Sequence, residues 1–250
     1  MNIILPLAGI KNIDESNYSY PLPLIEVNGF PLIQYVTENL LSIKGNNNFI
    51  FIVREEDCSK YHLDKTLKLL VPNSKVCILK SKTNGAVSSI LMAIDLVTNK
   101  EEEVIIANPD QFFVTDINKS LFKFRKEKAS GGLITFKSVH PRWSFVLTDE
   151  KNNVLQAAEK NPISRNAIAG FYYFDSFNTF VKCAFKAIEI EDYHNGSFFT
   201  SALINQLILL NKKILNFEIN GEDYKSFYST QKIKEFEFYL NKKNEKTQFR

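Results

Sequence analysis

The chain has 250 residues, of which 44% are hydrophobic and 24% are charged, so it can form one large domain with a substantial core. Its 31 basic and 28 acidic residues give a net charge of +3, which is too weak a balance to indicate a nucleic-acid partner. No apolar run approaches the roughly 20 residues that a membrane span requires, so we expect no membrane insertion.

The cysteine and histidine residues indicate a reduced protein without a zinc site. The three cysteines are odd in number, far apart and without a C-x-x-C motif, and the three histidines lack metal-ligand spacing. A disulfide framework is therefore not expected, and a cytoplasmic location follows. The N-terminus also lacks the basic region and cleavage site of a signal peptide.

Predicted strands and helices alternate through the first half of the chain. Continuous apolar runs, typical of strands buried on both faces, occupy residues 3–7, 49–53, 75–79 and 104–107. Helical spacing of apolar residues predicts helices that begin at Pro31 and that span 55–71 and 83–97. Repetition of this kind predicts parallel strands joined by right-handed crossovers.

The second half changes to a mixed pattern. Strands are predicted at 131–136, 144–147, 154–158, 167–174 and 213–219, with the second and third forming a hairpin. Helices are predicted at 176–189, 197–210 and 232–240. We therefore expect one mixed-sheet domain over residues 1–240, followed by a flexible tail at 241–250.

The first predicted strand leads into a sequence typical of a nucleotide site. Residues 3–7 run into Ala8 and Gly9, a polar loop follows, and then comes Pro-Leu-Pro-Leu-Ile-Glu-Val-Asn-Gly-Phe-Pro-Leu-Ile at 21–33. An α/β protein builds a nucleotide site from such a strand, turn and helix at the carboxyl end of its first strand. Leu7, Ala8 and Gly9 are accordingly candidate nucleotide contacts.

This stretch resembles the sugar-phosphate nucleotidylyltransferases, which carry L-x-x-G-x-G-x-R, a spacer and P-K-P-L-I-x-V-x-G-x-P. The second motif matches closely. In the first motif, this chain has Gly9-Ile10-Lys11 where the family has G-x-G, and the family Arg is missing. In the second motif, Leu22 replaces the lysine between the two prolines. The resemblance runs from Ile3 to about Phe236. It implies an α/β protein, a three-layer α/β/α sandwich with a mixed, mostly parallel central sheet, similar also to related glycosyltransferases.

Asp110 is the strongest candidate for a catalytic and metal-binding residue. It follows Asn108 and Pro109, just past the end of a predicted buried strand, where a carboxylate can hold Mg²⁺. The family has a metal-binding Asp at this point, which implies that Asp110 binds Mg²⁺ and that Asn108 lies beside the nucleotide. An ordinary Pro-Asp turn is the alternative.

Three further segments match the family in order. Gly85 opens a predicted helix where the family places a nucleobase against bare backbone, although a glycine near a helix start is also a common local accommodation. The run Glu159-Lys160-Asn161-Pro162 resembles the family's E-K-P segment, which implies that Lys160 meets the acceptor phosphate and that Glu159 orients the sugar. A solvated ion pair is the alternative. Gly170 begins a match to the G-x-Y strand and is a candidate substrate contact.

Arg142 and Trp143 lie together in a predicted loop at 137–144. A cation beside an indole could bind an anionic or sugar acceptor. A solvated loop with a capping tryptophan is an equal alternative.

The departures from the family concern the charges that hold a triphosphate. Lys11 could supply one cation, and it is a candidate catalytic residue, but nothing obvious replaces the lysine lost at Leu22. The second metal-binding Asp of the family motif W-x-D-x-G-T has no counterpart in register at 224–230. Electrostatic contacts of this kind dominate phosphoryl and nucleotidyl transfer.

The resemblance predicts a Mg²⁺-dependent nucleotidyltransferase. It would transfer a nucleoside monophosphate from a nucleoside triphosphate to a sugar phosphate or a similar acceptor, in bacterial capsule or lipopolysaccharide synthesis. A homodimer is a candidate assembly. Two alternatives remain open: a catalytically degenerate protein that binds a nucleotide or nucleotide-sugar, and a glycosyltransferase that uses a nucleotide-sugar donor. Fold analogy does not choose among the three.

Overall fold

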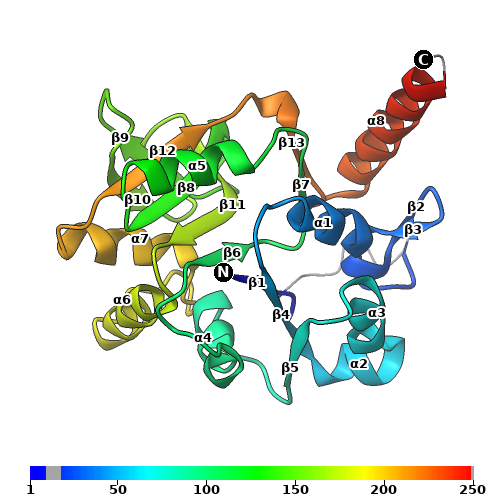
Figure 1. The fold of residues 1–250 in the computed structure, drawn as a ribbon, viewed down its shortest axis with the longest axis horizontal. Coiled ribbons are helices and arrows are strands. Elements are labelled where there is room, and N and C mark those ends of the chain that lie inside the picture. Colours follow the sequence, from blue (N-terminus) through cyan, green and yellow to red (C-terminus); the bar gives the residue numbers. More distant parts are fainter. Residues whose placement is uncertain (10–17, 249–250) are drawn as a thin grey trace.

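The computed structural model describes residues 1–9 and 18–248 (Figure 1). Its strands are β1 (Asn2–Pro6), β2 (Glu26–Val27), β3 (Phe30–Pro31), β4 (Asn48–Arg54), β5 (Lys75–Leu79), β6 (Val104–Ala107), β7 (Gln111–Phe113), β8 (Gly131–Lys137), β9 (Phe145–Thr148), β10 (Val154–Ala158), β11 (Asn166–Phe174), β12 (Ile214–Glu218) and β13 (Tyr224–Ser226). Its α-helices are α1 (Leu32–Leu41), α2 (Glu55–Tyr61), α3 (Leu63–Leu70), α4 (Ala86–Leu91), α5 (Asn118–Lys126), α6 (Phe177–Glu189), α7 (Thr200–Leu209) and α8 (Thr230–Gln248). Short 3₁₀ helices are η1 (Leu22–Leu24), η2 (Ile94–Leu96) and η3 (Gly221–Asp223).

One mixed sheet forms the centre of the molecule. Its strand order is β10-β9-β11-β6-β1-β4-β5, and β8 joins through β11 and carries β12. Strands β6, β1, β4 and β5 are parallel, whereas β11 runs antiparallel to β6, β8 and β9. The predicted sheet is confirmed, and its parallel part comes from the first half of the chain.

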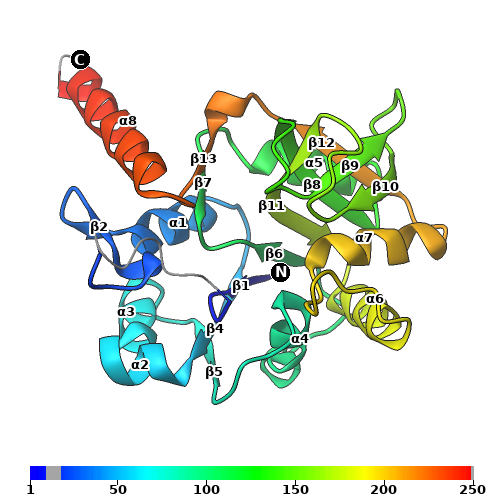
Figure 2. The same ribbon diagram turned by 180° about the vertical axis from the view of Figure 1, so that it is seen from behind.

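Alternate residues of the central strands point into two different cores, because successive side chains of a strand face opposite sides of a sheet. Ile3 and Leu5 pack into one core, to which α1, α3, α5 and α8 contribute. Ile4 and Ile106 pack into the other, to which α4, α6 and α7 contribute. Helices therefore cover both faces, and the predicted three-layer sandwich is confirmed (Figures 1 and 2).

Three predicted helices have different bounds in the structure. The helix expected over 55–71 breaks into α2 and α3 at His62, whose φ of 55° ends α2 in a left-handed conformation. The helix expected over 83–97 is shorter, because α4 begins only after Gly85 and the chain continues from Ala93 as η2. Helix α8 continues to Gln248, so residues 241–248 are helical, and the mobility expected of the tail stays a prediction. No helix in the described part of the chain is long and apolar enough to cross a membrane.

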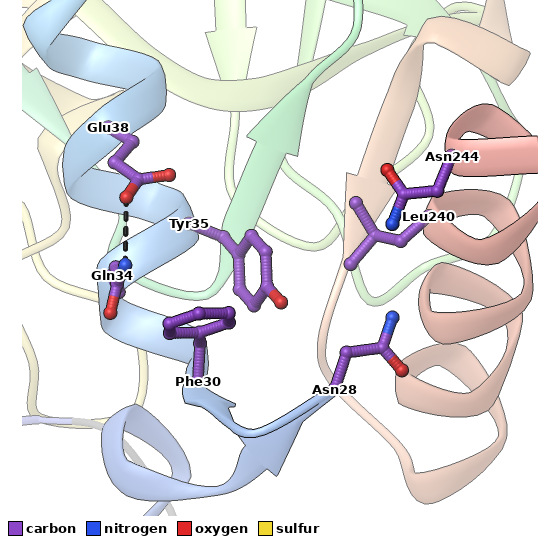
Figure 3. A pocket seen from close by; sticks show the side chains of 7 residues that line it. All are labelled: Asn28, Phe30, Gln34, Tyr35, Glu38, Leu240 and Asn244. Atoms are coloured by element: carbon purple, nitrogen blue, oxygen red, sulfur yellow. Dashed lines mark hydrogen bonds between the residues drawn. The ribbon is translucent and has the colours of Figure 1, made fainter. Parts of the chain in front are cut away.

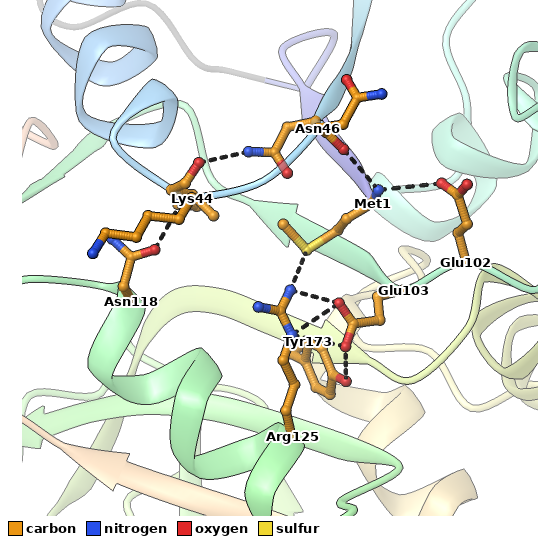
Figure 4. A network of polar contacts seen from close by, with 10 residues as sticks. Met1, Lys44, Asn46, Glu102, Glu103, Asn118, Arg125 and Tyr173 are labelled. Carbon is orange, nitrogen blue, oxygen red and sulfur yellow. Dashed lines mark hydrogen bonds and ion pairs between the residues drawn. The ribbon is translucent and has the colours of Figure 1, made fainter.

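The two edges of the parallel strands differ in chemistry. At the amino edge, Arg125 donates to both carboxylate oxygens of Glu103, and the Tyr173 hydroxyl donates to Glu103 Oε1 at 2.8 Å (Figure 4). Burial of Glu103 opposes its charge, but the hydrogen bonds from Arg125 and Tyr173 outweigh this effect and lower the pKa of Glu103. The polar groups of these three side chains are bonded to one another, so the network stabilises the fold. Functional residues are therefore expected at the opposite, carboxyl edge of the parallel strands.

Candidate functional site

Asp110 lies at the carboxyl edge, in the short connection between β6 and β7. Strand β13 pairs with β7, and the Phe227 amide donates to the Asp110 carbonyl oxygen at 2.8 Å, so the C-terminal half of the chain fixes this backbone. Burial of the carboxyl group raises the pKa of Asp110, although the residue as a whole stays partly exposed. Among the described residues, no cationic side chain forms an ion pair with it. A carboxylate with no counter-ion at this edge is suited to a cation that arrives with a ligand.

Gly170 gives the loop that carries Asp110 its shape. It sits at an irregular point of β11 with a φ of 58°, and a Cβ atom on it would lie 2.5 Å from Gln111 Oε1 and 2.6 Å from Asn108 Nδ2. Its carbonyl oxygen accepts hydrogen bonds from the Asn108 amide at 2.8 Å and from Gln111 Nε2 at 2.9 Å. The glycine is therefore explained by close packing of the loop, and the predicted substrate contact through Gly170 stays a prediction.

The acceptor pair, Glu159 and Lys160, follows β10. Ser144 and Ser201 both donate to Glu159 Oε2, the second at 2.7 Å, so one carboxylate oxygen is held by two hydroxyl groups and Oε1 has no protein donor in the described chain. Lys160 has a φ of 53°, and its Nζ lies 4.9 Å from the centroid of the Phe199 ring. Glu159 is therefore held by specific hydrogen bonds, whereas Lys160 is exposed and lies over the Phe199 ring.

Two buried tyrosines connect the acceptor pair with Asp110. Burial raises the pKa of Tyr172 in β11, and the charge of Glu159 raises it further. Burial likewise raises the pKa of Tyr224 in β13, with the charges of Asp110 and Tyr172 adding to the effect. Each of the two carboxyl groups therefore lies near enough to a buried tyrosine to affect its pKa: Glu159 near Tyr172, and Asp110 near Tyr224.

The space beside Gly85 is occupied by another part of the protein. A Cβ on Gly85 would lie 2.6 Å from the Phe198 carbonyl oxygen and 2.7 Å from the Phe198 nitrogen, and the φ of Gly85 is 94°. On this side, then, the expected room for a nucleobase is filled by backbone. The structure supplies a different reason for the glycine, and the nucleobase contact stays a prediction.

Arg142 and Trp143 both contact the Tyr228 ring and differ in their other partners. The indole of Trp143 packs edge-on against Phe136, Tyr224 and Tyr228, so the capping alternative accounts for this residue. The Arg142 guanidinium stacks on the Tyr228 ring at 3.7 Å, and its backbone amide and Nε donate to the Nδ1 atom of His140. Arg142 is exposed and could reach a ligand, whereas Trp143 is half-buried among these aromatic rings.

On the side where the sequence predicts nucleotide contact, the described residues carry few charges. Lys11 lies outside the described residues. Leu7 is buried, while Ala8 and Gly9 are progressively more exposed at the end of β1. Leu22, at the position of the family lysine, is 3% exposed in the core beneath η1, so it does not face a phosphate. Phe227, whose amide bonds to Asp110, is fully buried and packs on Phe236.

The metal-ligating side chains of the described residues fit only a metal site that a bound substrate completes. In the described part of the chain, no three carboxylate, cysteine or histidine side chains gather where they could hold a metal ion. A preformed protein cage is therefore not present among these residues. Mg²⁺ is commonly held by one or two carboxylates together with substrate phosphates, and the isolated carboxylate of Asp110 fits that arrangement.

A separate cavity of about 310 Å³ lies away from this site (Figure 3). The residues that line it come from the β2–β3 hairpin, α1 and α8: Asn28, Phe30, Gln34, Tyr35, Glu38, Leu240 and Asn244. Gln34 and Glu38 are joined by a hydrogen bond of 2.9 Å along α1, and the Phe30 ring packs edge-on against Tyr35, which contacts Phe236 of α8. It contains none of the candidate residues of the carboxyl edge.

The sequence did not indicate Ser144, Ser201, Tyr172 or Tyr224 as site residues. Ser144 directly follows the Arg142-Trp143 pair, and Tyr172 lies inside the G-x-Y strand, so both were within recognised segments. Ser201, in contrast, reaches Glu159 from 42 residues away along the chain. Only the packing of α7 against β10 brings the two together.

Comparison with known proteins places the chain in a family. The sequence model of the nucleotidyl transferase family matches residues 17–229. The bifunctional protein GlmU of Methanocaldococcus jannaschii is 27% identical over 158 residues, which are 62% of this chain and 35% of that protein. The chain thus spans about a third of the length of this curated relative.

Solved structures show the same fold. A nucleoside-diphosphate-sugar pyrophosphorylase from Vibrio cholerae superposes with a TM-score of 0.80 at 20% identity, over 94% of this chain and 99% of that one. The inositol-1-phosphate CTP transferase from T. maritima superposes with a TM-score of 0.73 at 15% identity, over 92% and 90% of the two chains. The resemblance seen in the sequence is confirmed, and the chain belongs to the nucleotidyl transferase family.

Proposed function

We propose that the protein transfers a nucleoside monophosphate from a nucleoside triphosphate to the phosphate group of a sugar phosphate or a similar phosphorylated polyol, and releases pyrophosphate. The observation that carries the proposal is the acceptor pair: Glu159 is held through one oxygen by two serine hydroxyls, beside Lys160. A lysine is suited to a phosphate, and a fixed carboxylate oxygen is suited to a hydroxyl of a sugar or polyol. The printed names of the relatives, a nucleoside-diphosphate-sugar pyrophosphorylase and an inositol-1-phosphate CTP transferase, support this acceptor class.

Each residue then has a defined task. Lys160 binds the acceptor phosphate, and Glu159 Oε1 accepts a hydrogen bond from an acceptor hydroxyl. An oxygen of the acceptor phosphate attacks the α-phosphorus in line; a new P–O bond forms, and pyrophosphate leaves with the electron pair of the broken bond. Asp110 would hold Mg²⁺, which when bound neutralises charge on the triphosphate. Lys11 is the candidate for a further cation on the nucleotide side.

The proposal includes the setting of the reaction. We place it in the bacterial cytoplasm and in the synthesis of surface polysaccharide such as capsule or lipopolysaccharide, on the strength of the sequence resemblance alone. A homodimer is part of the same expectation.

A second candidate is a protein that binds a nucleotide or nucleotide-sugar without catalysis. Burial of Leu22 at the position of the family lysine favours it, as does the lack of a second acidic residue in register at 224–230. Each removes a charge from the part of the site where transition-state stabilisation is largest.

One assay separates the two functions. Pyrophosphate release is measured with ATP, CTP, GTP, UTP and dTTP, each with Mg²⁺ and with a hexose 1-phosphate or inositol 1-phosphate. Release that needs both an acceptor and Mg²⁺, and that is lost in Asp110→Asn, supports the transferase. Nucleotide binding by calorimetry without any release supports the binding protein, and the absence of both binding and release would overturn both functions.

A further inference from the structure

Residues 198–201, which we call the bridging segment, connect two parts of the carboxyl edge that lie far apart in the sequence. They enter and begin α7 with Phe198-Phe199-Thr200-Ser201. One end contacts the loop at 83–87, where the sequence predicts nucleotide contact, and the other end contacts the acceptor pair.

The first end is bound to the loop by its backbone. The Phe198 amide donates to the Asn84 carbonyl oxygen at 2.8 Å, and the Phe198 carbonyl oxygen accepts from the Val87 amide at 3.2 Å. Gly85 lies between these two bonds, and a Cβ on it would be 2.6 Å from the Phe198 carbonyl oxygen. Contact this close lets neither backbone move without the other.

The other end is bound to the acceptor pair by side chains. The Phe199 ring lies under Lys160 Nζ at 4.9 Å, and Ser201 Oγ donates to Glu159 Oε2 at 2.7 Å. Ser201 is 1% exposed and belongs to α7, whose Leu203 and Ile204 are fully buried, so the hydroxyl is held by a rigid element. Asn205 of α7 also bonds to both backbone groups of Ala157, just before the pair.

We propose that the bridging segment is a positioning element that couples the nucleotide loop to the acceptor pair, so that a shift at 83–87 changes the placement of Glu159 and Lys160. This inference rests on the proposed function for the identity of the two ligands. The physical basis is the short path: four consecutive residues carry both sets of contacts, so displacement of Phe198 moves the Phe199 ring and the Ser201 hydroxyl. Coupling of this kind is reciprocal between two bound ligands.

The main test uses Ser201→Ala, with Ser120→Ala as a matched control. Ser120 is also fully buried and loses one hydrogen bond, to the Ile117 carbonyl oxygen at 2.7 Å, but it lies in α5. We expect Ser201→Ala to raise the KM for a hexose 1-phosphate about tenfold, with the nucleotide KM and kcat within about threefold of wild type. Ser120→Ala should change none of the three. An unchanged acceptor KM, or an equal rise in the control, would overturn the proposal.

A second readout requires no ligand. Hydrogen exchange at the Val87 and Phe198 amides reports the bonds between the loop and the bridging segment. In Ser201→Ala these amides should exchange faster, whereas in Ser120→Ala they should match wild type. Unchanged exchange at both amides in Ser201→Ala would contradict the coupling even if the acceptor KM rises.

The opposite end is tested by Gly85→Ala, which forces Phe198 to move. If the variant folds, the exchange of amides at 157–161 should increase; constant exchange there would contradict the coupling. If it does not fold, the Ser201→Ala results decide. Because hydrogen exchange needs no substrate, absence of transferase activity in the wild type would refute the proposed function and still leave the coupling to be judged by exchange.

Discussion

The acceptor side and the nucleotide side of the carboxyl edge are built differently. On the acceptor side, Glu159 and Lys160 each have fixed partners from distant parts of the chain. On the nucleotide side, Leu22 is buried in the core, and Asp110 has no counter-ion among the described residues. Under the proposed function, described residues would make the contacts that select an acceptor, whereas binding of a triphosphate would depend on Asp110, on a metal ion and on Lys11.

This difference shows how a protein can lose a charged family residue from its binding site and still keep the family fold. An apolar residue at position 22 packs into the core beneath η1, so loss of the lysine adds to stability while it removes a charge from the site. The acceptor side has no such compensation, because the half-buried Glu159 carboxylate would lose both of its hydroxyl donors. Selection for folding alone would thus tolerate the first change and resist the second.

The largest expected effect comes from restoring the family residue at Leu22. Leu22→Lys places an amine in a site that is 3% exposed, so we expect the free energy of unfolding to fall by ~3–5 kcal/mol. The penalty should grow as the pH falls, because burial lowers the pKa of a lysine and the charged form is the one disfavoured. Chemical denaturation measures it, with Leu22→Met as the volume-conserving control. A stable variant that binds a triphosphate more tightly would show that position 22 can turn toward the phosphates.

The next effect is at Gly170, where the two sides meet. Gly170→Ala introduces a Cβ 2.5 Å from Gln111 Oε1 at a φ of 58°, and we expect a loss of roughly 2–4 kcal/mol in the free energy of unfolding. Gly221→Ala is the control, because nothing lies within 4 Å of its Cβ and its φ is not positive. Thermal and urea unfolding compare them. Equal stability of the two variants would mean that the loop at Asp110 is not held as tightly as its contacts indicate.

The pH dependence of the Tm of Asp110→Asn tests whether the carboxyl group on the nucleotide side is buried. Burial raises the folded-state pKa of Asp110 above its ordinary 3.8, so its contribution to stability is present below that value and is lost as the pH rises through the folded pKa. In metal-free buffer, Asp110→Asn should therefore have a higher Tm than wild type at pH 7, and the gain should disappear near pH 3.5. Mg²⁺ with a nucleotide should raise the Tm of wild type only. A gain that is the same at both pH values would show that the carboxyl group is not desolvated.

The smallest effect is expected at Arg142. Its stacking on Tyr228 is exposed, so Arg142→Ala should lower the free energy of unfolding by about 0.5–1 kcal/mol. If the residue only covers Tyr228, the acceptor KM should stay within about threefold of wild type. A rise of tenfold or more would establish the acceptor contact that its sequence position suggested and would add a third group to the acceptor side.

The strands could be predicted because their chemistry is local. The bounds of β6 agree with the apolar run at 104–107, since a parallel strand buried on both faces must be apolar throughout. The bounds of β5 also agree with the run at 75–79, but β5 is an edge strand with exposed residues, so the expected burial on both faces is wrong for it. The break at His62 could not be predicted, because a left-handed histidine leaves no mark in the helical pattern. The position of Asp110 followed from its strand, whereas the hydroxyl groups on Glu159 came from tertiary packing.

Gly85 also makes a contact with a distant segment that the sequence alone could not reveal. Gly85 and its place before a helix are visible in the sequence, and the resemblance supplied a nucleobase as the reason for the glycine. The structure supplies the backbone of Phe198, more than 100 residues further along the chain, at 2.6 Å from the Cβ position. A glycine that serves a distant segment has the same local signature as one that serves a ligand, so only the fold distinguishes them.

The central claim is that the two sides of the site bind different ligands, and calorimetry on two variants tests it most directly. Separate dissociation constants are measured for the nucleotide with Mg²⁺ and for a hexose 1-phosphate or inositol 1-phosphate, in wild type, Asp110→Asn and Glu159→Gln. We expect Asp110→Asn to weaken nucleotide binding at least tenfold and to leave acceptor binding within about twofold, and Glu159→Gln to do the reverse. Equal loss of both ligands in each variant, or loss of neither, would contradict the account.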